Sequence, residues 1–286
     1  MKKLLIIDGK TLSYKAFMGS KNSKVRTKTG HQVPMLGKFM SYVLDLMGKY
    51  EPTSIVLTFA LPDFPEHKIE ATPSYKLQFS LLQVLMEGLG MTCLKSEKNT
   101  GHIIKTLVDL AEKEDYKSYV VTEEEKLLQV LNKKTHVILL GKQKDTHYNP
   151  NKFYLEYGIE ALYYPDLYAL TGWEDYVNGI PGVGKKTAIK MIHEYGPVAR
   201  ILQDMNLVSD FRLRELVDLY QEELEDGLNR IKLNVLDDFE VDFEKSQFDG
   251  FGQGDQMVLS HFGLDKILEE SGVDRKDDLP LFEFME

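Results

Sequence analysis

The apolar residues of the first 160 positions form short runs separated by longer stretches with helical spacing. The short runs predict strands over Lys3–Ile7, Ser54–Phe59, Ser118–Val121 and His136–Leu140. Between them, apolar residues recur every three or four positions and predict helices over Pro34–Tyr50, Phe79–Leu89, Ile103–Glu114 and Glu124–Leu131. Short apolar strands that alternate with helices are typical of a parallel sheet covered by helices on both faces. The sequence therefore predicts an α/β fold.

The pattern changes in the second half of the chain. From about Pro165 the strand-like runs stop, and helical spacing continues through Val208–Asn229. We therefore expect two domains, an α/β domain over residues 1–160 and a helical domain over residues 161–286. The chain has no internal repeat and no low-complexity linker.

Composition indicates an ordinary globular protein, with 43% hydrophobic and 28% charged residues. The single cysteine, Cys93, excludes an internal disulfide and fits a reducing cytosol, so we expect a cytoplasmic protein. No apolar run reaches the length of a membrane span, and we expect no membrane association. The first residues, MKKLLIIDG, contain too short an apolar run for a signal peptide and are typical of a first strand.

The net charge of −10 is unevenly distributed along the chain. Residues 1–203 carry 27 lysines and arginines against 22 acidic residues, whereas residues 204–286 carry 8 against 23. The acidic excess therefore belongs to the C-terminal part. The preceding part is mildly basic, which is compatible with binding phosphate groups.

The stretch Asn178–Glu194, NGIPGVGKKTAIKMIHE, is a glycine-rich turn that leads directly into a helix. Glycine allows a close approach of backbone to a partner, and the first N–H groups of a helix can bind a phosphate. Ile180 and Val183 are expected to anchor the turn in a core. The pattern resembles the helix-hairpin-helix of DNA-binding proteins, which contacts the DNA backbone without reading bases. The residues expected to contact DNA here are Gly179, Gly182, Gly184, Lys185, Lys186 and Thr187.

Taken with this hairpin, the order of segments resembles the 5′-nuclease family, which comprises flap endonucleases, phage 5′–3′ exonucleases and the N-terminal domain of bacterial DNA polymerase I. LLIIDGKTLSYKAF and ALTGWEDYVNGIPGVGKKTAIKMIHEYG are close matches. The segments SIVLTFA, PSYK, GHIIKTLVDLAEKE and YVVTEEEKLLQVL follow in the family's order and are looser matches. The resemblance covers nearly the whole chain. It implies a PIN-like sheet domain, and a K⁺ ion held by backbone carbonyls of the turn Gly179–Gly184.

The resemblance also implies a site for divalent metal ions, and this sequence departs from the family at that site. An aspartate expected after the second strand is Ala60, and an expected acidic cluster is replaced by Asn99–His102. Of a pair of aspartates expected after Thr122, one is Glu124 and the other is Lys126. A lysine in this position places positive charge where a metal ligand is needed, or it forms an ion pair that neutralises Glu124 and Asp8.

Three carboxylates remain from the family's set of seven or eight. These are Asp8, Glu124 and Asp175, with Glu123, Glu125 and Glu174 as further acidic residues close in sequence. Three carboxylates could hold one Mg²⁺ or Mn²⁺ ion with water completing its shell. The resemblance therefore implies one ion at most and does not support a full two-metal site.

A second departure concerns the basic arch that clamps single-stranded DNA in the family. Tyr75 and Lys76 resemble the residues at the base of this arch, and Lys68 lies where a basic residue is usual. The helix after Lys76 follows about a dozen residues sooner than in the family, so we expect a shortened arch. Lys68 and Lys76 are nevertheless counted among the residues expected to contact DNA.

Three functions are compatible with these features. The first is a family member that binds duplex or branched DNA, or 5′ ends, without sequence specificity, and whose hydrolytic activity is lost or strongly reduced. The second is an active metal-dependent 5′–3′ exonuclease or flap endonuclease with a reduced site. The third is a fold relative that binds proteins through its acidic tail. The hairpin argues against the third and the loss of carboxylates favours the first, with DNA as the expected partner alongside replication or repair proteins.

Overall fold

The structure is a computed structural model that describes residues 1–20, 24–60, 72–173, 176–237 and 239–271. Contacts between residues divide the chain into two compact units, and each is described by itself. The first, called the sheet unit below, comprises residues 1–123 and the described residues from 237 to 271. The second, called the hairpin unit below, comprises residues 124–236. The domain boundary expected near residue 160 stays a prediction. Among the described residues, no helix is both long and apolar enough to cross a membrane.

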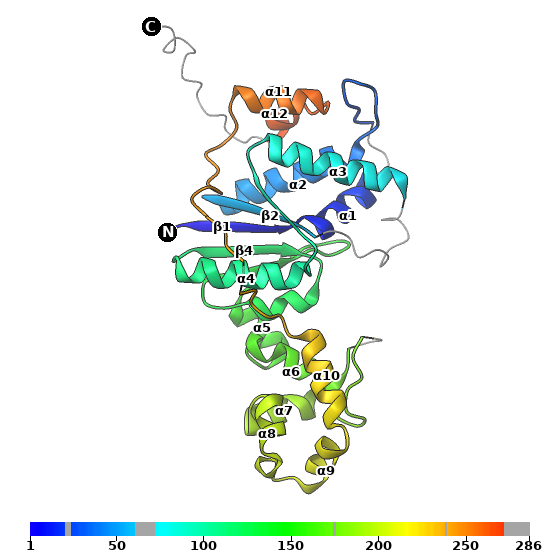
Figure 1. Ribbon diagram of the computed structural model, residues 1–286, viewed down its shortest axis with the longest axis vertical. Helices are drawn as coiled ribbons and strands as arrows, with labels where there is room; N and C mark the ends of the chain where they lie inside the picture. The colour runs from blue at the N-terminus through cyan, green and yellow to red at the C-terminus, as the bar shows by residue number, and fades with distance from the viewer. Residues whose placement is uncertain (21–23, 61–71, 174–175, 238, 272–286) are drawn as a thin grey trace. The chain divides into compact units, whose positions relative to one another are not determined.

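The described chain forms strands, α-helices and short 3₁₀ turns (Figure 1). The strands are β1 (Lys3–Asp8), β2 (Ser54–Ala60), β3 (Thr92–Ser96), β4 (Lys117–Thr122), β5 (Thr135–Leu139) and β6 (Thr146–Tyr148). The helices are α1 (Gly9–Gly19), α2 (Pro34–Tyr50), α3 (Pro73–Gly88), α4 (Thr100–Lys113), α5 (Pro150–Tyr157), α6 (Tyr164–Thr171), α7 (Lys185–Tyr195), α8 (Val198–Gln203), α9 (Phe211–Leu219), α10 (Gln221–Ile231), α11 (Gln253–His261) and α12 (Ile267–Ser271). The 3₁₀ turns are η1 (Glu125–Val130), η2 (Ala161–Tyr163) and η3 (Met205–Leu207).

The strands form one sheet in the order β3-β2-β1-β4-β5-β6. β1 pairs in parallel with β2 and β4, and β2 pairs in parallel with β3. In the central strand, the four residues from Leu4 to Ile7 are all 0% exposed, because both faces of the sheet are covered. The predicted α/β fold with a parallel sheet is thus confirmed for the core. The prediction missed β6, which pairs with β5 in antiparallel orientation and makes the sheet mixed.

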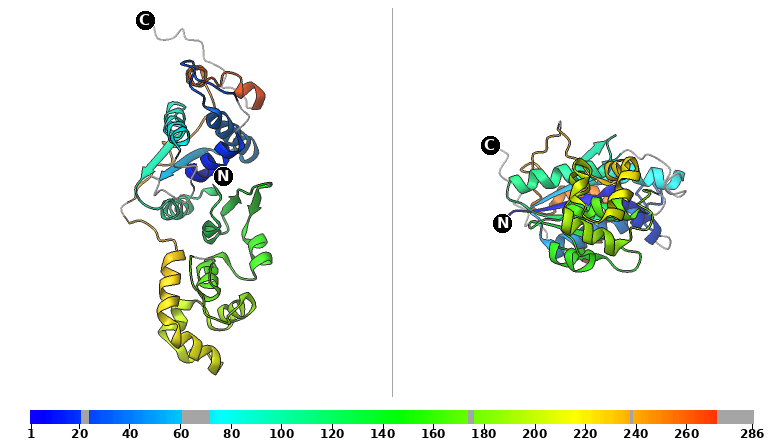
Figure 2. Two further views of the ribbon diagram at one scale, coloured as in Figure 1. Left: turned by 90° about the vertical axis from the view of Figure 1, so that its right-hand side faces the viewer. Right: turned by 90° about the horizontal axis from the view of Figure 1, so that it is seen from below.

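Helices cover the two faces of the sheet unit (Figures 1 and 2). α1, α2 and α3 follow strands that progress towards one edge, whereas α4 returns from β3 to β4 across the sheet. Because such crossovers are right-handed, the return connection lies on the opposite face from the others. α4 accordingly packs on β1, β2 and β4.

Several predicted helices begin, end or divide at other residues. α1 was not predicted, and α3 begins at Pro73, six residues before the predicted start, because Thr72 caps the helix and proline suits a first helical position. The segment predicted as a helix over Glu124–Leu131 is the 3₁₀ turn η1. The helical stretch predicted over Val208–Asn229 is divided into α9 and α10 at Tyr220.

Residues 243–248 of the C-terminal chain pack against other parts of the sheet unit. Ile55 donates its backbone N–H to the Ser246 carbonyl at 3.0 Å, and Phe248 donates to the Thr53 carbonyl at 3.1 Å. The ring of Phe243 lies 5.3 Å from that of Tyr116. Local sequence patterns do not predict these contacts, because the two hydrogen bonds join residues nearly 200 positions apart.

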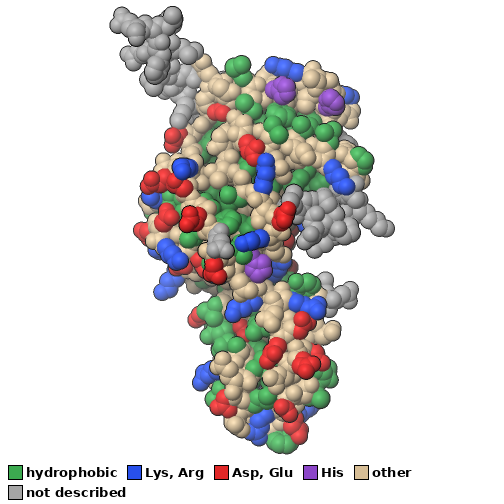
Figure 3. All heavy atoms as spheres, viewed as in Figure 1, with side chains coloured by type: hydrophobic (Ala, Val, Ile, Leu, Met, Phe, Trp, Pro, Cys, Tyr) green, Lys and Arg blue, Asp and Glu red, His purple; other side chains and the backbone are tan. Residues whose placement is uncertain are grey.

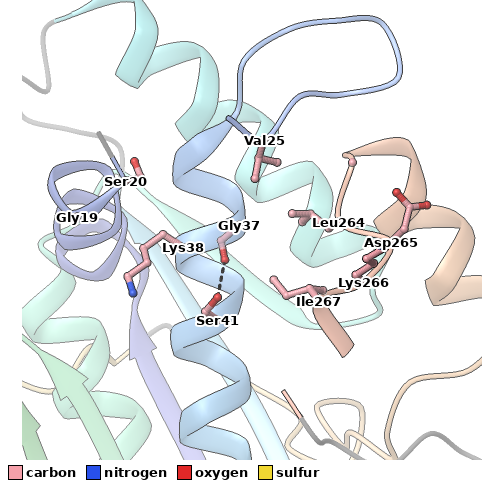
Figure 4. Close-up of a pocket in the computed structure, with 11 residues that line it drawn as sticks. Gly19, Ser20, Val25, Gly37, Lys38, Ser41, Leu264, Asp265, Lys266 and Ile267 are labelled. Atoms are coloured by element: carbon pink, nitrogen blue, oxygen red, sulfur yellow. Dashed lines mark hydrogen bonds between the residues drawn. The ribbon is translucent and has the colours of Figure 1, made fainter. Parts of the chain in front are cut away.

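The end of the described chain lies against α2. Gly37 is buried there, and a Cβ on it would lie 3.3 Å from both Leu264 and Val25, so glycine allows the close approach of the C-terminal segment. Beside this contact is an open cavity of about 490 Å³, with Lys38 and Ser41 on the α2 side and Asp265 on the other (Figure 4).

Candidate nucleic-acid interface

Asp8 lies at the C-terminal end of β1 and is 1% exposed. Its Oδ1 accepts the backbone N–H of Thr11 at 3.3 Å and so caps α1. Its Oδ2 accepts the hydroxyl of Thr122, the last residue of β4, at 3.0 Å. Both oxygens of the predicted first ligand are therefore engaged within the sheet unit.

The resemblance found in the sequence places the family's acidic cluster at the start of α4. Asn99 Oδ1 accepts the N–H of Gly101 at 2.8 Å and caps the helix. Thr100 and Gly101 are buried, and the whole segment carries no carboxylate. Ala60, which replaces another expected aspartate, is the last residue of β2. Asn99 therefore serves as a helix cap where the resemblance places an acidic cluster.

Glu124 precedes the turn η1 in the hairpin unit and forms an ion pair with Lys126. Glu124 Oε2 lies 3.4 Å from Lys126 Nζ, and both side chains are less than one third exposed. The lysine that replaces an expected aspartate thus neutralises the neighbouring carboxylate. The ion pair expected from the sequence is thus present with Glu124, whereas the hydrogen bonds described for Asp8 come from Thr11 and Thr122.

The residues described by the structure do not fit a two-metal site. Among them, no group of three histidine, cysteine, aspartate or glutamate side chains could hold a metal ion. Asp175 and Glu174 lie outside the described residues. The assignment of Asp8, Glu124 and Asp175 to a single ion stays a prediction, and we derive no catalytic step through a metal.

The hairpin between α6 and α7 depends on glycines at points of close backbone approach. Gly172 has φ +82°, a conformation that strains other residues. A Cβ on Gly179 would overlap the backbone of Thr171 and Gly172. The N–H of Ile180 donates to the carbonyl of Leu170 at 2.9 Å, so the turn is fastened to the end of α6.

The tip of the hairpin combines buried apolar anchors with an exposed backbone. Ile180 and Val183 are 3% and 4% exposed and anchor the turn in the core, as the sequence predicted. Gly182 and Gly184 are exposed, and a Cβ on either would meet no atom within 4 Å. Packing therefore does not require glycine at these two positions, although the φ of +83° at Gly182 does.

α7 begins at this exposed tip without a side-chain cap. Gly184 is its N-cap residue and offers no side-chain acceptor. The first N–H groups of a helix have no partner within the helix, so they face solvent or a ligand here. Lys186 is exposed and Thr187 half-buried in this same first turn. The arrangement provides backbone donors and a positive charge for an anion.

Lys185 has a structural role that the sequence did not reveal. Its Nζ donates to the carbonyl of Glu156 at 3.3 Å and lies 4.7 Å from the ring centre of Tyr157. His193, two turns further along α7, bonds the carbonyl of Gly158 at 2.8 Å. Two basic side chains on one face of α7 therefore hold the end of α5. In the sequence, the spacing of eight residues between Lys185 and His193 is the signal that both lie on one face of a helix.

Aromatic residues pack behind the hairpin. Trp173 stacks on Tyr168 at 4.5 Å and meets Tyr164 edge-on at 5.8 Å. Burial raises the pKa of Tyr157 in this cluster to about 12, so its hydroxyl stays protonated at neutral pH. The cluster packs the hairpin unit together.

Of the two lysines expected near the arch, Lys76 is exposed in the first turn of α3, and Lys68 lies outside the described residues. The neighbouring Tyr75 is buried, and its hydroxyl lies 2.7 Å from that of Ser13 on α1. This hydrogen bond fixes the start of α3, and with it Lys76, to the sheet unit. The expected shortening of the arch falls largely on residues outside the described part.

The chain is similar to several known proteins. Residues 3–158 match the family model described as the 5′-3′ exonuclease, N-terminal resolvase-like domain. The chain is 30% identical to DNA polymerase I of Mycobacterium tuberculosis over 246 residues, which are 77% of this chain and 27% of that protein. It is 24% identical to DNA polymerase I of Bacillus subtilis, covering 96% of this chain and 32% of that protein. The chain thus spans about a third or less of these relatives.

Solved structures share the fold at low sequence identity. The T5 D15 protein, co-crystallised with metal ions, superimposes with a TM-score of 0.61 at 16% identity, covering 94% of this chain and 98% of that one. The catalytic core of Rad2 in complex with a DNA substrate gives a TM-score of 0.55 at 17% identity, covering 94% and 92%. Because the family model covers more than half of the chain, the resemblance found in the sequence is confirmed. The chain belongs to the 5′-3′ exonuclease family.

Proposed function

We propose that this protein binds duplex or branched DNA without sequence specificity, through the exposed start of α7, and that its hydrolytic activity is lost or strongly reduced. The observation that carries the binding proposal is the uncapped first turn of α7 behind Gly184, with Lys186 beside it. Contacts of this kind bind the phosphate backbone and carry no sequence information.

The division of labour between the two lysines makes this proposal specific. Both lysines are exposed, but Lys185 donates its Nζ to the carbonyl of Glu156 and lies over the ring of Tyr157. We therefore assign the contact with DNA mainly to Lys186 and to the backbone N–H groups of the turn. The K⁺ ion expected at the carbonyls of Gly179–Gly184 stays a prediction, as do partner proteins of replication or repair.

Binding is tested with Lys186→Glu and a short duplex carrying a 5′ flap, by fluorescence anisotropy in EDTA. We expect the affinity to fall about tenfold on every sequence. The slope of log affinity against log salt concentration should decrease by about one, which corresponds to the loss of one phosphate contact. Lys142→Glu is the matched control, because Lys142 is exposed in the same unit and the change in net charge is identical. Equal losses in both variants would mean that overall charge, and not the hairpin, governs binding.

The proposal of weak or absent hydrolysis is supported by the residues that replace the acidic positions. Asn99 caps α4, Ala60 ends β2, and Lys126 neutralises Glu124. Asp8 keeps its carboxylate, but both oxygens accept hydrogen bonds from threonines. Such a set leaves too few free carboxylates to hold two divalent ions beside a phosphate.

The test is a cleavage assay on the same 5′-flap substrate with Mg²⁺ and with Mn²⁺. We expect no measurable product with Mg²⁺ and at most a feeble rate with Mn²⁺ that Asp8→Ala abolishes. DNA binding in EDTA should persist in Asp8→Ala, which separates binding from catalysis. Rapid Mg²⁺-dependent turnover that requires Asp8 and Asp175 would establish instead an active nuclease with a reduced site.

A further inference from the structure

A groove of about 500 Å³ lies in the sheet unit, between α3, α11 and the loop that precedes α2. Its floor is the outer face of α3, where Leu77, Leu81, Val84 and Gly88 recur at helical spacing. α11 comes closest at Gly88, where a Cβ would lie 3.2 Å from Val258. The floor from Leu77 to Gly88 is about 16 Å long, enough for about five residues of extended chain.

The apolar floor of this groove is open to solvent. Leu77 is 48% exposed and Val84 57% exposed, although they share a helix with the fully buried Leu82 and Leu85. Figure 3 shows apolar side chains and histidines together over the region of α3 and α11. An apolar stripe with one polar rim is typical of a surface that another segment covers.

We propose that this groove is the docking site for the chain's own segment Leu279–Met285. The described chain ends at Ser271, only ten residues after His261, which itself lines the groove. The segment reads LPLFEFM, with six apolar residues among seven. The eight residues from Ser271 to Leu279 can span up to about 26 Å, so the segment can return to the helix that precedes it.

Charge supports this occupant. The segment is flanked by Asp277, Asp278 and Glu286, with Glu283 inside it. The rim of the groove carries His31 and His261, and Lys28 is exposed on the loop that donates a backbone hydrogen bond to the His261 carbonyl at 3.2 Å. An apolar peptide with acidic flanks therefore matches an apolar floor whose rim carries Lys28 and two histidines, although Asp265 also lies near Lys28.

The docked segment would also constrain the start of α3. Leu77 follows Tyr75 and Lys76 directly, and Tyr75 is tied to Ser13. Occupancy of the groove would thus reduce fraying at the helix end that carries Lys76. This gives a readout that is independent of DNA binding.

The proposal is tested on the full chain with the photoreactive residue benzoylphenylalanine in place of Phe284. After irradiation, the monomer and the cross-linked dimer fractions are separated and digested, and the cross-linked peptides of each are identified by mass spectrometry. We expect the cross-links to concentrate on α3 and α11. In the background Leu77→Glu/Val84→Glu they should fall about tenfold, because charges on the floor oppose apolar burial. Both side chains are exposed, so this variant leaves the core intact.

The matched control is Leu155→Glu, which places a charge on an apolar residue 86% exposed in the other unit and should leave the cross-links unchanged. Hydrogen exchange gives a second measurement, since Phe282→Ser/Phe284→Ser should speed exchange in the first turns of α3. Cross-links spread without preference, or unchanged exchange in α3, would overturn the proposal. Cross-links found only between two chains would overturn it in favour of a second copy as the occupant.

Discussion

The starts of α4 and α7 are two helix N-termini that the sequence treats in opposite ways. At α4, Asn99 supplies a side-chain oxygen, so the N–H of Gly101 is satisfied within the chain. At α7, Gly184 supplies no side chain, and the first turn is exposed. A capped start stabilises its own helix and is closed to ligands, whereas an uncapped start gives up some stability and can bind an anion.

This difference bears directly on the proposed function. The capped helix stands where the resemblance places metal-binding carboxylates, and its first turn is closed by Asn99. The uncapped helix stands where the resemblance places contacts with the DNA backbone, and its first turn has no side-chain cap. On the proposed function, binding and hydrolysis are separable because different helix starts would support them.

The largest effect is expected from breaking the hairpin that presents α7. A Cβ introduced by Gly179→Ala would overlap the backbone of Thr171 and Gly172, which cannot move without releasing Ile180. We expect the free energy of unfolding to fall by about 3 kcal/mol, with DNA binding lost. Urea denaturation followed by the fluorescence of Trp173, the chain's single tryptophan, measures this locally.

Gly184→Ala is the matched control for that substitution. Its Cβ would meet no atom within 4 Å, and its backbone φ of −88° suits any residue. Its unfolding transition should therefore coincide with that of the unmodified protein. A large loss in Gly184→Ala, or none in Gly179→Ala, would contradict the packing described for the hairpin.

The next effect comes from uncapping α4. Asn99→Ala removes the acceptor for Gly101 and should lower the free energy of unfolding by about 1 kcal/mol. Asn99→Asp keeps an acceptor and should retain most of the stability, which circular dichroism during urea titration can measure. Neither substitution should alter DNA affinity. Weaker DNA binding in Asn99→Ala would show that α4 takes part in the interface after all.

The contrast between these helices also shows what could be predicted from the sequence. The apolar run of β1 and the burial of the anchors Ile180 and Val183 were predicted correctly, because each follows from local residue pattern. The helix-hairpin-helix itself stays a prediction. β3 and β6 were missed, since β3 is a half-buried strand that includes an exposed lysine and β6 has only three residues. Local periodicity is too weak a signal for such strands.

Long-range contacts account for the other omissions. The bond from Thr122 to Asp8 joins residues 114 positions apart, and that from Lys185 to Glu156 joins residues 29 apart. No periodicity encodes such pairs. The cap at Asn99 could have been found, because asparagine before an apolar helical stretch is a known start signal.

A smaller effect is expected from giving α7 the cap that α4 has. In Gly184→Asn, the side-chain oxygen can accept an N–H of the first turn, which should raise the free energy of unfolding by a few tenths of a kcal/mol. The same bond removes a donor from the phosphate, so the affinity for DNA should fall by about fivefold. Gly184→Ala offers no acceptor and should retain the affinity. If both variants bind DNA equally, the N–H groups of this turn are not the phosphate site.

The smallest effect concerns α8, a third helix start, which is capped from another helix. Val198 donates its N–H to Asp166 Oδ1 at 2.7 Å, and Asp166 is 6% exposed on α6. Burial raises the pKa of Asp166 above its ordinary value of 3.8, although the hydrogen bond from Val198 opposes this. The folded state therefore binds this proton more tightly than the unfolded state. The protonated Asp166 therefore stabilises the folded state most fully below pH 3.8, the ordinary pKa. This stabilisation is lost as the pH rises through the raised pKa of the folded state.

Asp166→Asn keeps an oxygen for Val198 and removes the ionisation. The variant should match the unmodified protein below pH 4 and become more stable than it, by less than about 1 kcal/mol, as the pH rises towards 7. Asp166→Ala, which lacks the acceptor, should be less stable than Asp166→Asn at every pH. Urea titrations of the three proteins between pH 3.5 and 7 measure these differences in the free energy of unfolding. The contributions of the other carboxylates cancel in the comparison, because all three proteins share them. The opposite outcome is a stability advantage of Asp166→Asn that shrinks as the pH rises. It would show that the ionised Asp166 stabilises α8 by more than the burial of its charge costs.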